Sequence, residues 1–300
     1  MAQVTQADPT LQQAGPSWRE SRRYRDLIAQ IVAYVTVTAG AVILMIPFAW
    51  MLSSSLKPLD QIFVEPPQWI PQPIQWHNYR DAWLALPFTQ FLVNTLFITL
   101  LGMAASIFTS ALVAYGFARY RFPGRDILFI VLLSTMMLPY VVTLIPAFLI
   151  WRTLGLINTY DPLVVGALFG GGPFFIFLMR QFMLTIPEEM EEAARMDGAN
   201  TFQIFTLIVL PLVRPALLVV GIFSFQGFWN DFLGPLIYLN DLGKYTMTLG
   251  MFFFVGGASE APKWHWLMAM STLIALPILT IFFLAQRQFI EGITLTGLKG

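Results

Sequence analysis

Six long runs of apolar residues constrain this chain more than any other feature of its sequence. The runs cover residues 31–52, 91–117, 127–151, 162–179, 215–239 and 266–286, and only the fifth contains a charged residue, Asp231. The hydrocarbon core of a bilayer takes about 20 helical residues to cross. The runs are continuous rather than alternating, which favours helices over the strands of a membrane barrel. The sequence therefore predicts an all-α membrane protein with six transmembrane helices.

The composition supports the same conclusion. Of the 300 residues, 57% are hydrophobic and 11% are charged, whereas soluble domains carry about 25% charged residues. Too few polar side chains are present to cover a globule in water, so most of the surface must face lipid. Lys and Arg (17) balance Asp and Glu (17), and Cys is absent. These numbers argue against a nucleic-acid partner and exclude disulfides and thiolate metal sites.

The charges outside the runs predict how the chain is organised. Residues 1–26 are polar and then basic, which indicates a disordered N-terminal segment. Residues 27–287 form the six-helix domain, and residues 288–300 form a C-terminal tail. Most Lys and Arg residues fall on the N-terminal side of the membrane, so the positive-inside rule places both termini in the cytoplasm. The two long outside loops are then residues 53–88 and 240–265.

One cytoplasmic loop, residues 183–212, has the signals of two short helices. Pro187 suits the first position of a helix, and the acidic residues after it suit its first turn. Gly198 suits the residue that follows the helix end. Asn200 or Thr201 can cap the second helix, which ends toward Pro211.

The first of these helices has a face with small residues at its centre. Met190, Ala193, Ala194 and Asp197 recur at spacings of three or four, so they share one side of the helix. Such a face allows a groove of another protein to approach the backbone closely. A hairpin lying on lipid is the alternative, but the acidic residues disfavour it because cytoplasmic leaflets are anionic.

At this point the sequence resembles a known family. Glu192-Ala193-Ala194, then Gly198, then Leu210-Pro211 is similar to the conserved loop of ABC-importer permeases, in the maltose-type branch that takes up carbohydrates with an external binding protein. Three further segments resemble the same branch: Arg121-Phe122-Pro123-Gly124, Trp229-Asn230-Asp231-Phe232 and the tail from Gln286 to Gly300.

The resemblance implies a type I importer permease fold and a set of partners. A second permease subunit forms a heterodimer with this one, and a dimeric cytoplasmic ATPase binds ATP and Mg²⁺ and drives transport. An external solute-binding protein delivers the sugar, and the chain itself binds no cofactor and catalyses no reaction. It lacks a G-x-x-x-x-G-K-[ST] loop, which agrees with an energy source in a partner. The residues implied to couple this chain to the ATPase are Glu192, Ala193, Ala194, Asp197, Gly198 and Pro211.

Other candidate residues follow from the same resemblance and from their position. Trp229, Asn230, Asp231 and Tyr238 are candidates for the sugar path, because an acid inside a span usually faces a cavity or a partner. A structural role for Asp231 is the alternative. Contact with the binding protein is expected from Gly256, Gly257 and Trp264, unless their loop is a plain connector. The tail residues Gly297, Lys299 and Gly300 are expected to contact the ATPase, and no metal site is expected.

The sequence thus predicts a multi-pass permease of a bacterial or archaeal inner membrane. Its solute is a sugar or, alternatively, a glycerol-phosphate-like compound or another polyol. A secondary transporter is a weaker alternative, since internal repeats and paired intramembrane charges are not evident. A membrane enzyme is disfavoured because no catalytic groups converge.

Overall fold

The computed structural model describes residues 18–256 and 261–297, and these residues are helical with connecting turns and contain no strand. The chain divides into two units, residues 1–53 and 54–300. The first unit consists of most of helix α1 (Trp18–Ser55). The basic segment expected to be disordered to residue 26 is thus helical from Trp18 onward. Its Arg and Glu residues favour helix and lead into the apolar run without an intervening Gly or Pro.

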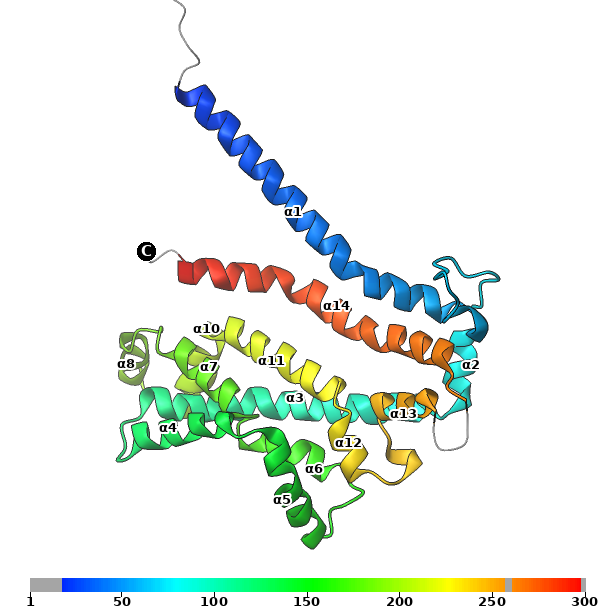
Figure 1. Cartoon of the computed structure of the whole chain (residues 1–300). Coiled ribbons are helices and arrows are strands. Elements are labelled where there is room, and N and C mark those ends of the chain that lie inside the picture. The colour runs from blue at the N-terminus through cyan, green and yellow to red at the C-terminus, as the bar shows by residue number, and fades with distance from the viewer. Residues whose placement is uncertain (1–17, 257–260, 298–300) are drawn as a thin grey trace, which may run out of the picture. The chain divides into compact units, whose positions relative to one another are not determined.

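The second unit contains the remaining helices (Figure 1). Its α-helices are α2 (His77–Ala85), α3 (Phe88–Arg119), α4 (Arg125–Ser134), α5 (Tyr140–Thr153), α6 (Asp161–Val164), α7 (Pro173–Met183), α8 (Glu189–Met196), α9 (Thr201–Gln203), α10 (Leu210–Leu212), α11 (Arg214–Trp229), α12 (Leu233–Tyr238), α13 (Met247–Phe252) and α14 (Trp264–Gly297). Short 3₁₀ turns are η1 (Leu59–Gln61), η2 (Thr135–Met137), η3 (Val165–Phe169), η5 (Leu242–Lys244) and η6 (Phe253–Val255), and η4 (Ile204–Val209) is a π-helical turn.

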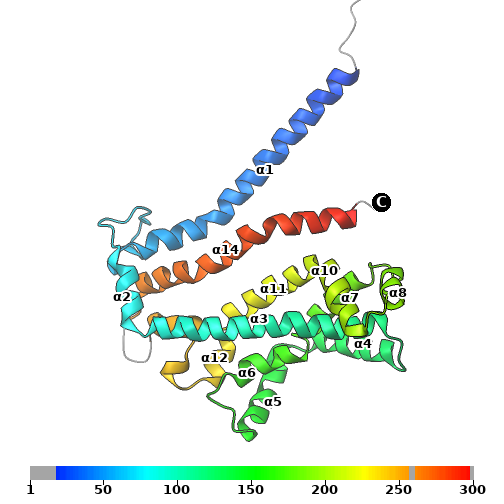
Figure 2. The ribbon, with the colours of Figure 1, turned by 180° about the vertical axis from the view of Figure 1, so that it is seen from behind.

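Helix α3 is the axis of this unit. It packs along α11 and α7, and both views show α2 at one of its ends and α8 at the other (Figures 1 and 2). Two apolar clusters surround it. One is near α8 and includes Ala114, Met179 and Val209. The other is near α2 and includes Phe91 and Met270. Both ends of α3 are therefore fixed in packed surroundings.

Four described helical segments are long and apolar enough to cross a membrane, and two bent pairs bring the number to as many as six. The single segments cover residues 24–55, 88–119, 161–183 and 264–286. In the bent pairs, α4–η2 meets α5 at 101°, and the helical stretch 201–212 meets α11 at 79°. Each of the six predicted runs is helical over most of its length, and six crossings result if each bent pair forms one.

The predicted third, fourth and fifth spans are interrupted, which the apolar runs did not indicate. Pro139 precedes α5, and Leu138 before it is extended, as residues before proline usually are. Gly170, Gly171 and Gly172 all have positive φ and separate η3 from α7. In the fifth span α11 ends at Trp229, and α12 begins after a break.

The predicted C-terminal tail is also partly helical. Helix α14 continues through residue 288 to Gly297, so no break separates the last span from the tail over the described residues.

Candidate functional site

The loop 183–212 has the two-helix form that its local signals predict. Helix α8 follows Pro187, and Gly198 has a φ of 86° just after the helix ends. Asn200, rather than Thr201, caps the next helix. Its side chain accepts from the Gln203 amide, while its own amide donates to the Gln203 side chain. These bonds fix the start of the second helix, and α8 lies at one end of α3 (Figures 1 and 2).

Helix α8 has an outward face and an inward face. Glu192, Ala193 and Asp197 are exposed, and Met196 is 88% exposed. Ala194 lies on the other side, buried in the apolar cluster near α3. The expectation that Ala194 shares an exposed face with Met190, Ala193 and Asp197 is therefore wrong. A helix this short depends on tertiary packing, and Ala194 supplies that contact.

A buried acid, Glu191, holds α8 to α3. Its side chain is 2% exposed, and one carboxylate oxygen accepts from Nε of Arg119, whose side chain is 5% exposed. The other oxygen accepts from the Tyr115 hydroxyl at 3.1 Å and lies 3.6 Å from Nη2 of Arg195. Arg119 also donates from Nη2 to the Ile186 carbonyl at 2.9 Å. One guanidinium thus binds both α8 and the turn before it.

Sequence reasoning missed Glu191. Four acids, Glu188, Glu189, Glu191 and Glu192, stand close together in the chain. Nothing local tells which of them faces inward, because the partner Arg119 is 72 positions away. The Ala194 spacing was the one available signal: an acid three residues before a buried small residue lies on the same helix side.

Pro211 lies in α10, directly after the π-helical turn Ile204–Val209. Proline has no amide to bond the carbonyl four residues earlier, and a widened turn is a common way to accommodate that loss. The second helix thus runs through Pro211 and ends at Leu212.

Two of the four predicted path residues are buried inside the chain. Trp229 is 2% exposed, stacks on Phe225 and donates from Nε1 to the Ile274 carbonyl at 3.0 Å. Tyr238 is 5% exposed and stacks on Phe148. In this structure both residues hold helices together, and their rings are not open to a solute.

The other two path residues lie at the break between α11 and α12. Asn230 is exposed and Asp231 is partly exposed. Asp231 accepts from the Gly234 amide at 3.1 Å, which caps the start of α12, and its carbonyl accepts from Thr248 at 2.6 Å. A Cβ at Gly234 would lie 2.4 Å from Oδ2 of Asp231. The carboxylate is thus held by the backbone while one side remains accessible.

The loop 240–265 is largely packed on α3 rather than free. Asn94 donates to the carbonyls of Gly243 and Tyr245, and Thr95 accepts from the Met247 amide at 2.9 Å. Gly256, with a φ of 106°, turns the chain away after η6. Just before α14, the Lys263 amide donates to the Phe254 carbonyl at 2.8 Å, so the chain is bonded to η6 there as well.

Two of the predicted contact residues, Trp264 and Gly297, lie at the two ends of α14. Trp264 begins α14 and packs edge-on against Phe63 at 5.8 Å. Gly297 ends that helix. Gly257, Lys299 and Gly300 lie outside the described residues.

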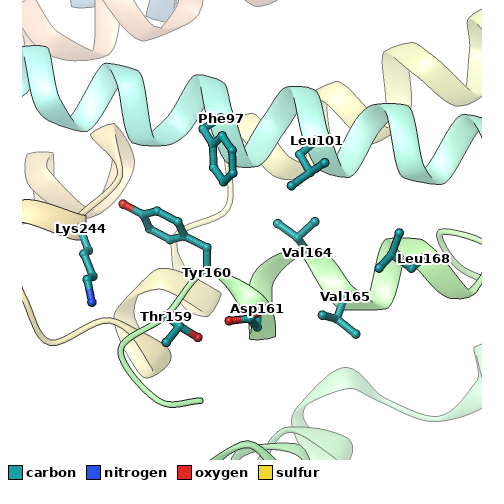
Figure 3. A pocket seen from close by; sticks show the side chains of 9 residues that line it. All are labelled: Phe97, Leu101, Thr159, Tyr160, Asp161, Val164, Val165, Leu168 and Lys244. Atoms are coloured by element: carbon teal, nitrogen blue, oxygen red, sulfur yellow. The ribbon is translucent and has the colours of Figure 1, made fainter. Parts of the chain in front are cut away.

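A cavity of about 480 Å³ opens between α3, the α6–η3 segment and η5 (Figure 3). Phe97 and Leu101 of α3 point toward it, and Tyr160 and Lys244 lie at one end. Lys244 donates to the Asn158 carbonyl at 2.7 Å, so its ammonium is already bound. The lining contains none of the predicted path residues, and its polar side chains, Thr159, Tyr160, Asp161 and Lys244, belong to the α6–η3 side and η5 rather than to α3.

Comparison with known proteins extends over most of the chain. Residues 106–294 match the family model described as the binding-protein-dependent transport system inner membrane component. The galactooligosaccharides transport system permease protein GanQ of Bacillus subtilis (strain 168) is 31% identical over 93% of this chain and 98% of its own length. The sn-glycerol-3-phosphate transport system permease protein UgpE of Pectobacterium atrosepticum is 30% identical over 91% and 98%.

A solved structure has the same fold. A chain of a bacterial ABC transporter involved in the import of the acidic polysaccharide alginate superposes with a TM-score of 0.76 at 24% identity. The match covers 91% of this chain and 99% of that chain. The interrupted spans and the short helix α8 thus lie within a fold already observed in an importer.

Proposed function

This chain belongs to the family of binding-protein-dependent transport system inner membrane components, and from that premise we propose that it is the permease subunit of an ATP-driven sugar importer. A second permease subunit completes the pore, a cytoplasmic ATPase dimer binds ATP and Mg²⁺, and an external binding protein delivers the solute. The chain contributes a path through the membrane and catalyses no reaction.

The observation that carries this proposal is the outward face of α8. A rigidly held helix presents an acid, a methyl-sized side chain and an exposed methionine at the end of α3: Glu192, Ala193 and Met196. A small, firmly mounted projection suits insertion into a groove of another protein. We propose that this end of α3 faces the cytoplasm and that the groove belongs to the ATPase. Exposed Asp197 and the turn at Gly198 complete the projection.

The break between α11 and α12 is our candidate for the solute path. Exposed Asn230 and half-exposed Asp231 offer an amide and a carboxylate to hydroxyl groups. The Gly234 amide donates to the Asp231 carboxylate and the Thr248 hydroxyl donates to the Asp231 carbonyl, so Asp231 is positioned before a solute arrives. A break in a helix is tolerated at membrane depth where it lines a wet cavity.

A sugar is the solute that this polar pair favours. An uncharged polyol needs hydrogen-bond donors and acceptors, whereas a phosphate is usually held by Arg or Lys. A relative of comparable similarity is named for sn-glycerol-3-phosphate, so a phosphorylated polyol is the second candidate.

Uptake by the complete complex in proteoliposomes tests the proposal. The chain is purified with its second permease and ATPase, and ATP is placed on the ATPase side with the binding protein on the other. We expect uptake of a labelled oligosaccharide that requires both ATP and the binding protein. Uptake driven by an ion gradient without ATP would identify a secondary transporter instead, and uptake of glycerol 3-phosphate alone would favour the second candidate.

A pair of tryptophan variants tests the role of α8. Ala193→Trp fills the outward face and is expected to abolish ATP-driven uptake while leaving the chain in the membrane. Asp126→Trp is the matched control, because Asp126 is 73% exposed on the neighbouring helix α4 and outside α8. Equal uptake by the two variants would contradict a docking role for α8.

A further inference from the structure

The strongest unexplained feature of the molecule is the buried ion pair beneath α8. Both oxygens of Glu191 are used, one by Arg119 and the other by Tyr115, and both donors lie on α3. Taking charges out of water is unfavourable, so such a pair is weak evidence for stability alone. The pair joins α8 to α3, so it can transmit a displacement of one helix to the other.

We propose that Glu191 is a positioning residue that fixes α8 to α3, so that force applied to α8 moves α3 with it. The proposal rests on the importer function given above and adds the connection through which the ATPase acts. Apart from this pair, α8 is held by the turns on either side of it and by apolar contacts of Ala194. An eight-residue helix has little stability of its own.

The geometry of Arg119 makes the link between α8 and α3 specific. Nε bonds the Glu191 carboxylate while Nη2 bonds the Ile186 carbonyl, so one planar group holds the helix and the turn before it in a fixed relation. A lysine carries the same charge, but its ammonium is a single point and does not reproduce the guanidinium fork. Arg195, which is 53% exposed and 3.6 Å from Glu191, is a looser partner on α8 itself and cannot link α8 to α3.

This link also joins α8 to a helix that continues without a break. Helix α3 runs from Phe88 to Arg119 and contains no proline. The predicted third, fourth and fifth spans are each interrupted. Force that enters α3 through Arg119 is therefore delivered along a single stiff element.

The test measures ATP hydrolysis and uptake together in the reconstituted complex. Glu191→Gln keeps the size of the side chain and removes its charge. We expect the ATP hydrolysed per solute imported to rise by about tenfold, within the range typical of coupling between sites. Arg119→Lys is expected to give a smaller rise, and Tyr115→Phe the smallest, because each removes fewer contacts.

The exposed pair between Arg125 and Asp126 provides the control. It lies on α4, next in the chain after α3, and its carboxylate is 73% exposed. Asp126→Asn removes a pair between an arginine and a carboxylate without touching α8. The amount of ATP that this variant hydrolyses per solute imported should therefore match that of the unchanged protein. An unchanged ratio in Glu191→Gln, or a parallel fall of hydrolysis and uptake in all three variants, would overturn the proposal and leave Glu191 a packing residue.

A second measurement separates this inference from the importer function. Hydrogen exchange of the α8 amides in the purified complex should be faster in Glu191→Gln than in Asp126→Asn. Unchanged exchange at α8 would refute the link between α8 and α3 even if the complex imports a sugar. Absence of ATP-driven uptake in the unchanged complex would refute the importer function while the exchange result still decides whether Glu191 holds α8. If Glu191→Gln fails to assemble, the milder Arg119→Lys and Tyr115→Phe variants decide by the same two readouts.

Discussion

Replacing Gly171 by alanine should destabilise the protein through two separate effects. Gly171 has a φ of 64°, which costs an L-residue about 1–2 kcal/mol. A Cβ there would lie 2.7 Å from both Cβ and Oγ of Ser106 on α3. Overpacking of this kind typically costs about 1–3 kcal/mol. Together these effects lower the free energy of unfolding by about 2–5 kcal/mol.

Gly124 separates the two effects. It has a φ of 81°, and a Cβ built there meets no atom within 4 Å. Gly124→Ala should therefore lower the free energy of unfolding only by the cost of the positive φ, about 1–2 kcal/mol. The difference between the variants measures the contact with Ser106.

Reversible unfolding of the purified protein in detergent provides the assay. A double variant, Gly171→Ala with Ser106→Gly, removes the clashing atoms and should recover much of the lost stability, less about 0.5–1 kcal/mol for glycine within a helix. Equal destabilisation by Gly171→Ala and Gly124→Ala, with no recovery in the double variant, would refute the claim that α3 and the break before α7 touch this closely.

Three smaller predictions concern the candidate path and the loop between α12 and α14. Trp229→Phe removes one buried donor and should lower the free energy of unfolding by about 0.5–1.5 kcal/mol while the KM for uptake stays unchanged. Asn230→Ala should raise that KM. A raised KM in Trp229→Phe with an unchanged KM in Asn230→Ala would place the Trp229 ring in the path. Gly234→Ala should displace the Asp231 carboxylate and reduce uptake more than it reduces melting temperature, and normal uptake would show that the position of this carboxylate is unimportant. Asn94→Ala should loosen the loop it bonds, seen as faster proteolysis between residues 240 and 256 in the purified complex, and an unchanged digestion pattern would contradict its anchoring role.

The parts of this molecule that were predictable from sequence are those with local causes. The apolar runs identify the membrane-crossing helices because a bilayer requires a minimum helix length. Gly198 and Asn200 specify the turn after α8, since positive φ and side-chain capping are properties of one or two residues. The position and form of α8 therefore followed from the sequence alone.

The breaks in the spans had local signals whose effect depends on tertiary surroundings. Pro139 is tolerated in many membrane helices when neighbours satisfy the freed carbonyls. Here it stands between two helices that meet at 101°. The three glycines at 170–172 permit many conformations, and at Gly171 a Cβ would lie 2.7 Å from Ser106, so the packing against α3 leaves no room for a side chain there.

The roles of individual side chains were the least predictable, because they depend on contacts distant in sequence. Trp229 has the aromatic ring expected of a sugar path, yet its Nε1 bonds a carbonyl 45 positions away. Ala194 was expected on an exposed face and is buried, and Glu191 was not distinguished from its acidic neighbours. In each case the deciding partner lies on another helix, which helical periodicity cannot identify.

Helix α3 connects the two loops that are expected to contact partner proteins. Near one end Asn94 holds the loop after α12, and at the other end Arg119 holds α8. At 1.5 Å per residue these anchors are about 38 Å apart along the helix, more than the thickness of a bilayer core. Since the third, fourth and fifth spans are each interrupted while α3 is not, a displacement of α8 reaches the far loop most directly through α3. The interrupted spans then surround an unbroken helix whose two ends are bonded to the two loops that are expected to contact partners.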